Sequence, residues 1–356
     1  MSASDGMNYA PEGKPAPVVK PGEFVFAAAF PDHGHIYGMC KGLMEAGGEL
    51  RYLYDPIPER VAAFHKRFPG VQVVDSFERI LDDPAIQMVA AAAVPSERGP
   101  IGCRVLRAGK DYFTDKTPFT TLDQLAEARR AHEETGRRYM VYFSERLHVE
   151  CAVFAGQLVE QGAIGKVVEV VGFGPHRLNA PTRPAWFFEK AKYGGILCDI
   201  GSHQFEQFLF YTGATDARIL SATVANRANP EYPELEDFGE AHLLGDNGAT
   251  NFIRVDWLTP DAARTWGDGR TFILGTEGYI EMRKYVEVGR GEGGNQLYLV
   301  NGKVEKHFEL TGKVGYPFFG QLILDSLNRT ENAMTQAHAF KAAELCLRAQ
   351  EVATRI

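Results

Sequence analysis

Short apolar runs alternate with stretches of helical periodicity along the first 143 residues of the chain. The apolar runs predict buried strands at residues 23–29, 50–54, 71–74, 86–94, 112–114 and 139–143. The stretches between them predict helices at residues 36–46, 58–68, 77–81, 95–108 and 122–135. Because parallel strands need crossover helices, this alternation predicts a doubly wound parallel sheet of the Rossmann type.

After residue 146 the pattern becomes dominated by strands. A helix is expected at 151–161, and strands at residues 167–173, 219–225, 241–244, 250–256, 270–274, 279–283 and 296–300. Asp246-Asn247-Gly248 and Asn301-Gly302 are hairpin signals. This half therefore predicts an α+β domain with an open, mostly antiparallel sheet that is backed by helices on one side.

The length of 356 residues is large for a single core, so two domains are expected. The patterns divide the chain into a flexible leader at 1–21, the α/β domain at 22–146 and the α+β domain at 147–356. The leader lacks the charged and apolar regions of a signal peptide. Since no uninterrupted apolar run approaches about 18 residues, a membrane-spanning helix is not expected.

Composition narrows the classes of partner. The formal net charge of −8 and the absence of a dense lysine and arginine cluster argue against nucleic-acid and membrane partners and favour small molecules. The five cysteines are odd in number, widely spaced and without a CxxC pair. This usage is typical of a reducing, cytoplasmic compartment and of a protein without a structural zinc site.

A polar stripe runs along the segment 193–211, which is otherwise apolar and helical in period. On a helix, Asp199, Ser202, His203 and Glu206 fall at i, i+3, i+4 and i+7, which is one face. Buried polar groups of this kind need partners, because leaving them unpaired costs several kcal/mol. The stripe is either a buried, internally satisfied Asp/His pair or one side of a functional cavity.

The loop after the first expected strand is a candidate ligand site, because doubly wound sheets bind ligands at the carboxyl ends of their strands. It has no GxGxxG motif, but small and polar residues there can bring backbone amides to a dinucleotide pyrophosphate: Ala29, Phe30, Asp32, His33, Gly34, His35 and Ile36. No metal is expected, because neighbouring loop residues rarely converge as ligands.

Asp55 ends the second expected strand, about 20 residues after this loop. A carboxylate there accepts hydrogen bonds from a ribose 2′-hydroxyl and repels a 2′-phosphate, so NAD is expected rather than NADP. No arginine suited to a 2′-phosphate is evident nearby. The alternative is that Asp55-Pro56 is simply a turn.

Several spaced motifs resemble one family. Asp115-Lys116-Thr117-Pro118 follows the strand at 112–114, and a Gly-Gly-x-x-x-Asp-x-Gly-x-His run spans 194–203. Further matching pieces are Pro95, GAIGKVVEV at 162–170, DNGAT at 246–250, GTEGYIEM at 275–282 and a closing helix near 333–353. From about residue 23 onward the chain resembles the glucose-fructose oxidoreductase and inositol dehydrogenase (Gfo/Idh/MocA) family.

The resemblance implies Lys116, Asp199 and His203 as the catalytic group, with Pro95, Asp115 and Lys116 also beside the cofactor. It implies an oxidoreductase that transfers a hydride between a nicotinamide and a carbinol of a sugar, cyclitol or related polyol. His203 is the expected base, since its ordinary pKa near 6.5 suits proton exchange. Whether His203 or Lys116 carries the proton stays open.

This chain departs from the family pattern at Asp115, which stands for a glutamate, and at Thr117, which stands for a proline. Tyr193 replaces the first of three glycines, which predicts a narrower site. The long loop at 174–195 is rich in histidine, arginine and aromatic residues, as functional loops are. His176, Arg183 and Trp186 are therefore expected to contact substrate together with Lys116, Asp199 and His203, although Trp186 can equally cover the core.

A homo-oligomer, dimer or tetramer, is also implied, because a second copy usually covers the open sheet in this family. Two other functions stay open on the same fold. One is NAD-dependent glycoside hydrolysis through transient oxidation, and the other is a non-catalytic sensor of sugars or dinucleotides.

Overall fold

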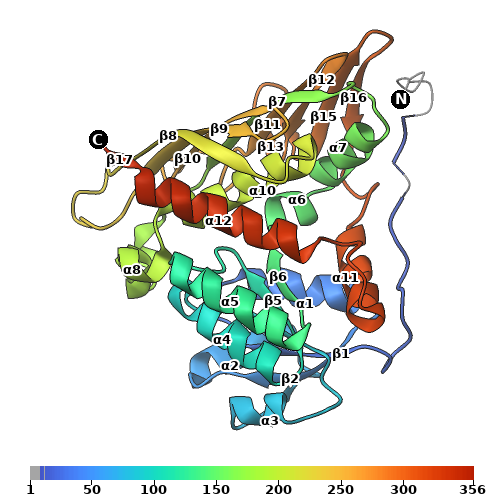
Figure 1. Ribbon diagram of the computed structural model, residues 1–356, viewed down its shortest axis with the longest axis vertical. Helices are drawn as coiled ribbons and strands as arrows, with labels where there is room; N and C mark the ends of the chain where they lie inside the picture. The colour runs from blue at the N-terminus through green and yellow to red at the C-terminus, as the bar shows by residue number, and fades with distance from the viewer. Residues whose placement is uncertain (1–8, 12) are drawn as a thin grey trace.

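The computed structural model describes residues 9–11 and 13–356 and contains two large sheets with helices between them (Figure 1). The first sheet has six strands in the order β3-β2-β1-β4-β5-β6, and every neighbouring pair is parallel. Its strands are β1 (Val25–Ala29), β2 (Glu49–Tyr54), β3 (Gln72–Val73), β4 (Met88–Ala91), β5 (Asp111–Asp115) and β6 (Tyr139–Tyr142). This is the strand order of the Rossmann fold, so the predicted doubly wound sheet is confirmed.

Helices cross over between these strands, as the parallel pairing requires. They are α1 (His35–Glu45), α2 (Pro58–Arg67), α3 (Phe77–Leu81), α4 (Pro95–Arg107) and α5 (Leu122–Thr135). Local sequence sets several ends: the hydroxyls of Ser76 and Thr121 cap α3 and α5, and Gly136 ends α5 with a φ of 63°. All residues of β1, β4 and β6 are buried, which matches their uninterrupted apolar runs, and β5 is buried as well although it contains two aspartates.

The second sheet has nine strands in the order β16-β15-β12-β11-β7-β10-β9-β8-β17. Its strands are β7 (Val167–Pro175), β8 (Ala217–Ala225), β9 (Phe238–Gly245), β10 (Thr250–Asp256), β11 (Arg270–Gly275), β12 (Gly278–Arg283), β15 (Gln296–Asn301), β16 (Glu305–Glu309) and β17 (Thr354–Arg355). The pairs β7/β10 and β8/β17 are parallel and the others are antiparallel. The mostly antiparallel sheet is confirmed, and β16, β17 and the small pair β13 (Val286–Glu287) and β14 (Glu292–Gly293) were not predicted.

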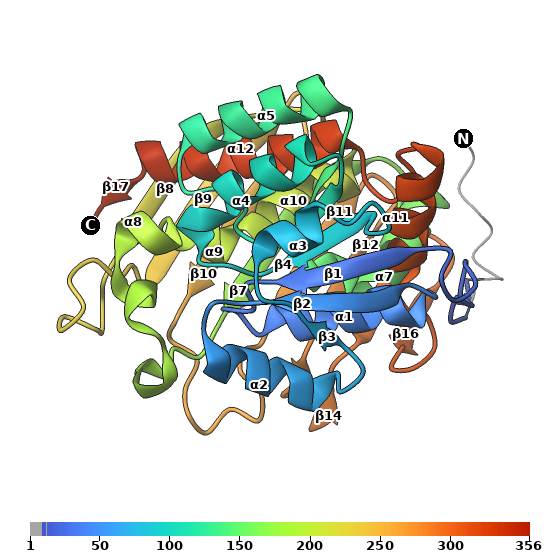
Figure 2. The same cartoon turned by 90° about the horizontal axis from the view of Figure 1, so that it is seen from below.

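Helices fill the space between the two sheets, chiefly α7 (Glu150–Glu160), α10 (Gly201–Thr212) and α12 (Gln336–Val352). A Cβ added at Gly174 would lie 2.8 Å from the Gln204 side chain, so this glycine lets α10 pack closely on β7. In Figures 1 and 2, α12 lies along α5 of the first domain, and it also packs against α10 and β8. The closing helix therefore joins the two domains.

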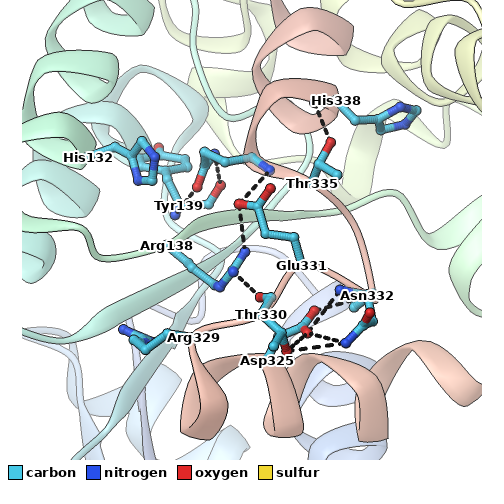
Figure 3. A network of polar contacts seen from close by, with 12 residues as sticks. His132, Arg138, Tyr139, Asp325, Arg329, Thr330, Glu331, Asn332, Thr335 and His338 are labelled. Atoms are coloured by element: carbon cyan, nitrogen blue, oxygen red, sulfur yellow. Dashed lines mark hydrogen bonds and ion pairs between the residues drawn. The ribbon is translucent and has the colours of Figure 1, made fainter.

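The turn between α11 (Pro317–Asn328) and α12 is tied to the parallel sheet by polar contacts (Figure 3). Arg138 pairs with Glu331 at 3.2 Å, and the Asp325 carboxylate accepts from the Thr330 hydroxyl at 2.6 Å. Gln336 donates to and accepts from the backbone of Tyr139, at 2.8 and 2.7 Å. This junction fixes α12 against β6. Two helices of the structure were not predicted from the sequence. They are α11 and the short helix α6 (Ser144–Leu147).

Residues 1–8 and 12 of the predicted leader lie outside the described residues. Its described part contacts the body: Tyr9 is 2% exposed and accepts a hydrogen bond from Lys306 at 3.0 Å. Val18 donates to the backbone of Ala46 at 3.0 Å. The domain boundaries and the flexibility of the leader stay predictions. No helix in the described ranges has the length and apolarity that crossing a membrane requires.

Candidate active site

A cavity of about 260 Å³ lies beside the carboxyl ends of β1, β4 and β5. It is lined by His33, His35, Pro95, Arg98, Lys116, His176, Arg177, Arg183, Trp186, Phe187, Asp199, Trp257 and Trp266. The structure thus brings together eight of the residues that the sequence predicted for the site. Ligands of doubly wound sheets bind at this edge.

Lys116 and Asp199 form the central pair of this cavity. The Lys116 Nζ lies 2.6 Å from Asp199 Oδ1, and the two side chains are 5% and 11% exposed. Burial by itself raises the pKa of Asp199, but the ammonium of Lys116 outweighs it and lowers the pKa below its usual value. The carboxylate is therefore ionised at neutral pH and orients the lysine.

The turn that carries Lys116 is held by Arg98, which the sequence analysis missed. Arg98 is 1% exposed and donates to the backbone oxygen of Ala93 at 2.6 Å. It also contacts the carbonyl of Lys116 and that of Thr117, the latter at 3.1 Å. The peptide bond between Lys116 and Thr117 is cis. The available signal was the position of Arg98, which lies three residues after Pro95 on the face of α4 whose other residues are apolar or small.

Asp115 contacts two histidines from the loop after β1. Its carboxylate oxygens lie 2.9 Å from His33 Nδ1 and 2.7 Å from His35 Nδ1. Burial by itself raises the pKa of Asp115, but His35, Arg98 and His33 hold it well below its usual range. Burial lowers the pKa of His33 to about 4.

The potential ligand atoms of His33, His35 and Asp115 lie within 4.8 Å of one another. The argument that such loop residues do not converge is therefore wrong, although the expectation that no metal binds stays a prediction. Arg98 lies 3.3 Å from the same carboxylate and already supplies positive charge there, which disfavours the binding of a metal cation.

The helix expected after Gly194 and Gly195 is two helices, α9 (Ile196–Asp199) and α10, and the short helix α8 (Lys190–Tyr193) ends before the two glycines. Gly195 separates α8 from α9, with a φ of 90° and with the Gln350 side chain in the space that a Cβ would occupy. Within the predicted stripe, Glu206 pairs with Arg146 and His338 instead of facing the cavity. Tyr193 does not narrow the site, because its hydroxyl donates to the backbone of Glu234 at 3.0 Å.

His203 differs most from expectation. It is 1% exposed, it is not among the side chains that line the cavity, and its Nδ1 has no hydrogen-bond partner in the described part of the chain. Burial lowers the pKa of His203 to about 3, against a smaller rise from Glu145. The assumption of an ordinary pKa near 6.5 is therefore wrong, because the ring is removed from water.

The loop after β1 offers one open backbone position to a dinucleotide. A Cβ added at Gly34, just before α1, would meet no atom within 4 Å. The neighbouring amides are partly engaged, since Ile36 N donates to His33 O at 3.2 Å and His35 N to His33 Nδ1 at 3.3 Å. Ala29 is buried at the end of β1. A helix N-terminus with an open glycine fits a pyrophosphate.

Phe30, which follows β1, has a φ of 50° and packs against Tyr54 and Phe77 at ring distances of 5.5 and 5.0 Å. Its amide donates to the Tyr54 carbonyl at 3.0 Å. Phe30 therefore anchors the loop after β1 through contacts within the protein. A backbone contact from its amide to a cofactor is not expected in this arrangement.

Asp55 accepts from the backbone of Ile57 at 2.7 Å, as a turn residue does. Arg60 on α2 lies 2.6 Å from Asp32 and 3.7 Å from Asp55. The statement that no arginine lies nearby is wrong, because α2 brings Arg60 back to the end of β2. Burial raises the pKa of Asp32 to about 6, against the opposing charge of Arg60.

Comparisons with known proteins agree with this arrangement. Residues 28–143 match the oxidoreductase family with an NAD-binding Rossmann fold, and residues 153–281 match the Gfo/Idh/MocA C-terminal domain. A solved candidate oxidoreductase from Erwinia carotovora atroseptica is 50% identical, with a TM-score of 0.91 over 94% of this chain and 100% of that one.

Two curated relatives from Bacillus subtilis are more distant. The scyllo-inositol 2-dehydrogenase (NAD(+)) is 26% identical over 66% of this chain and 66% of its own length. The scyllo-inositol 2-dehydrogenase (NADP(+)) is 25% identical over 48% of this chain and 47% of its own length. The chain thus spans about two thirds of the first relative and half of the second. The matches to both domains and the Erwinia structure show that this chain belongs to the Gfo/Idh/MocA oxidoreductase family.

Proposed function

We propose that the protein is a nicotinamide-dependent oxidoreductase that interconverts a carbinol and a carbonyl of a sugar, cyclitol or related polyol. The observation that carries the proposal is the buried Lys116–Asp199 pair, at 2.6 Å, in a cavity beside the cofactor edge of a Rossmann sheet. The names of the two inositol dehydrogenase relatives support a polyol substrate. No specific observation favours either the glycoside hydrolase or the non-catalytic sensor.

The residues of this chain supply binding and proton transfer. Lys116 Nζ donates a hydrogen bond to the reacting oxygen of the substrate and stabilises the negative charge that develops on it. In the direction of carbonyl reduction the ammonium delivers a proton to that oxygen and becomes the neutral amine, and in oxidation the neutral amine receives the proton of the hydroxyl. Asp199 holds the lysine in place. His203 lies outside the cavity lining, so Lys116 is the proton carrier in this proposal.

A bound nicotinamide supplies the hydride acceptor or donor for this reaction. The open backbone at Gly34 and the start of α1 would hold its pyrophosphate, with Pro95 and Asp115 beside it. The preference for NAD over NADP rests on Asp55 and is opposed by Arg60. We further propose a cytoplasmic homo-oligomer that has no nucleic-acid or membrane partner.

Mass spectrometry of the ligand released from the purified protein tests cofactor binding directly. A panel of sugars and polyols, followed at 340 nm with NAD and with NADP, then tests turnover. We expect Lys116→Ala to lose turnover but still to release a bound dinucleotide. A protein that carries no dinucleotide and turns over no substrate would contradict the proposal.

A further inference from the structure

The substrate cavity contains more hydrogen-bond donors than acceptors. Three buried N–H groups on its wall, Trp186 Nε1, Trp257 Nε1 and Arg177 Nε, have no hydrogen-bond partner in the described part of the chain. Across the described lining residues, no buried side-chain acceptor atom lacks a partner. Because a buried donor that stays unpaired costs free energy, a ligand that supplies acceptor oxygens would satisfy all three.

The cavity also has an excess of positive charge. Arg98 and Lys116 are matched by Asp115 and Asp199. Arg177 caps carbonyls of the 260–265 loop, and its nearest carboxylate is the fully exposed Asp261 at 3.7 Å. Arg183 has no carboxylate within 4.0 Å among the described residues. Two guanidinium groups therefore lack a buried counter-ion.

Of these two guanidinium groups, that of Arg183 is the better placed to bind a ligand in the cavity. Its guanidinium lies over the rings of Phe187 and Trp257, at 4.8 and 5.0 Å from their centres. Its Nε and one terminal nitrogen donate to the backbone oxygens of Leu178 and Arg177, at 2.8 and 3.2 Å. These contacts fix the plane of the guanidinium and leave donors on it free. Burial lowers the pKa of Arg183, against a smaller rise from the charge of Asp199.

We infer that the substrate is an acidic sugar or polyol whose carboxylate binds Arg183, with Trp186, Trp257 and Arg177 supplying further hydrogen bonds. A planar guanidinium that is held between aromatic rings matches a planar carboxylate, which it can bind through two parallel hydrogen bonds. This assignment rests on the proposed function and deepens it. Lys116 and Asp199 serve the reacting carbinol, and Arg183 serves the acid group.

Matched pairs of acid and neutral compounds test the inference: D-galacturonate against D-galactose, and D-gluconate against D-glucitol, with D-glucose 6-phosphate as the phosphate control. Turnover is followed at 340 nm with NAD and NADP, and binding to the cofactor-loaded protein is followed by calorimetry. We expect the acid of a pair to exceed its neutral partner in kcat/KM and in affinity.

Arg183→Gln should lower kcat/KM for the acid on the order of 10- to 100-fold, with little effect on the neutral sugar. Arg183→Lys should recover part of this loss, because the charge remains without the planar fork. Arg104→Gln is the matched control, since Arg104 is half-exposed and pairs with Glu78 on the outer side of α4. It should leave both activities unchanged.

Equal kcat/KM for acid and neutral compounds, or equal loss of both in Arg183→Gln, would overturn the carboxylate assignment while leaving the oxidoreductase proposal intact. A preference for the sugar phosphate alone would overturn it as well. If no compound turns over with either cofactor, the proposed function fails, and the calorimetric comparison of acid with neutral sugar still decides whether Arg183 binds a carboxylate.

Discussion

The Arg60 guanidinium lies 3.7 Å from the carboxylate of Asp55, the residue on which the expected NAD preference rests. In Rossmann sites a carboxylate at this place favours the ribose 2′-hydroxyl, and an arginine accommodates a 2′-phosphate. The two side chains therefore favour different cofactors, and their substitution separates the two effects.

We expect Asp55→Ala to narrow the preference for NAD, because it removes the repulsion of a 2′-phosphate. Arg60→Ala should weaken NADP binding on the order of 10-fold and change NAD binding little. Arg67→Ala, at the other end of α2, is the matched control. Calorimetry with both dinucleotides measures these effects, and NADP binding as tight as NAD binding in the unaltered protein would refute the preference.

Lys116→Ala should lower kcat by about 10²- to 10⁴-fold, because the lysine acts on charge that develops in the transition state. Asp199→Asn should also slow turnover, and the double variant should be little worse than the poorer single one, since the pair acts as a unit. Lys192→Ala is the control, because this exposed lysine pairs only with Glu189 on the surface of the described protein. Normal turnover in folded Lys116→Ala would remove the lysine from the mechanism.

His203→Gln should reduce kcat less than Lys116→Ala does, because His203 does not line the cavity. The melting temperature of the His203→Gln variant should change as well, since the ring of His203 is fully enclosed. Measuring kcat and melting temperature on both variants distinguishes a packing role from proton transfer. A loss of kcat in His203→Gln equal to that of the lysine variant, at unchanged stability, would return His203 to the reacting group.

Acid should destabilise the protein between about pH 6.5 and 4. Burial lowers the pKa of His33 and His176 to about 4 and that of His203 to about 3, from an ordinary value near 6.5. Below pH 6.5 the unfolded chain binds protons that the folded protein excludes, so stability present above that pH is lost as the pH falls. Asp32, with its pKa raised to about 6, opposes this trend in part.

Chemical unfolding at several pH values measures this effect. Replacing His176 by Gln should reduce the slope of stability against pH by up to about 1.4 kcal/mol per pH unit in this window. His65→Gln, which alters a histidine on the outer part of α2, should leave the slope unchanged. A stability that is flat from pH 7 to 4 would show that these rings are protonated in the folded state.

Chelator treatment should leave dinucleotide binding unchanged, because Arg98 and the histidines already satisfy the Asp115 carboxylate. Binding is measured by calorimetry before and after incubation with EDTA, and the metal content of the protein is measured in parallel. If EDTA abolished binding and zinc restored it, while His33→Ala and His35→Ala both lost zinc, the three residues would be a metal site.

The outer face of the nine-stranded sheet is expected to be covered by a second copy of the chain. Phe252, Val171 and Phe272 are half-buried neighbours across β10, β7 and β11 on this face. Phe252→Asp should therefore shift a dimer or tetramer toward the monomer in size-exclusion chromatography with light scattering. Val73→Asp, on the edge of the other sheet, is the control, and a monomeric unaltered protein would contradict the expectation.

The sequence by itself determined the order of the elements and the fold class. The uninterrupted apolar runs of β1, β4 and β6 are buried on both faces, and the helical period between them leaves a parallel sheet as the consistent arrangement. The resemblance of its motifs to the family also pointed to Lys116 and Asp199, and the structure places these residues 2.6 Å apart. Local patterns suffice here because propensity, periodicity and turn residues act over short distances.

Only the tertiary structure decided which charges meet. Arg98 reaches the turn at Lys116 from α4, and Arg60 returns to Asp55 on α2, and no local pattern identifies the partner that either arginine meets. His203 shares a helical period with Asp199, yet the packing of α10 on β7 encloses its ring while Asp199 lines the cavity. Burial and long-range charge set the pKa of such a group, and both depend on elements that are distant in the sequence.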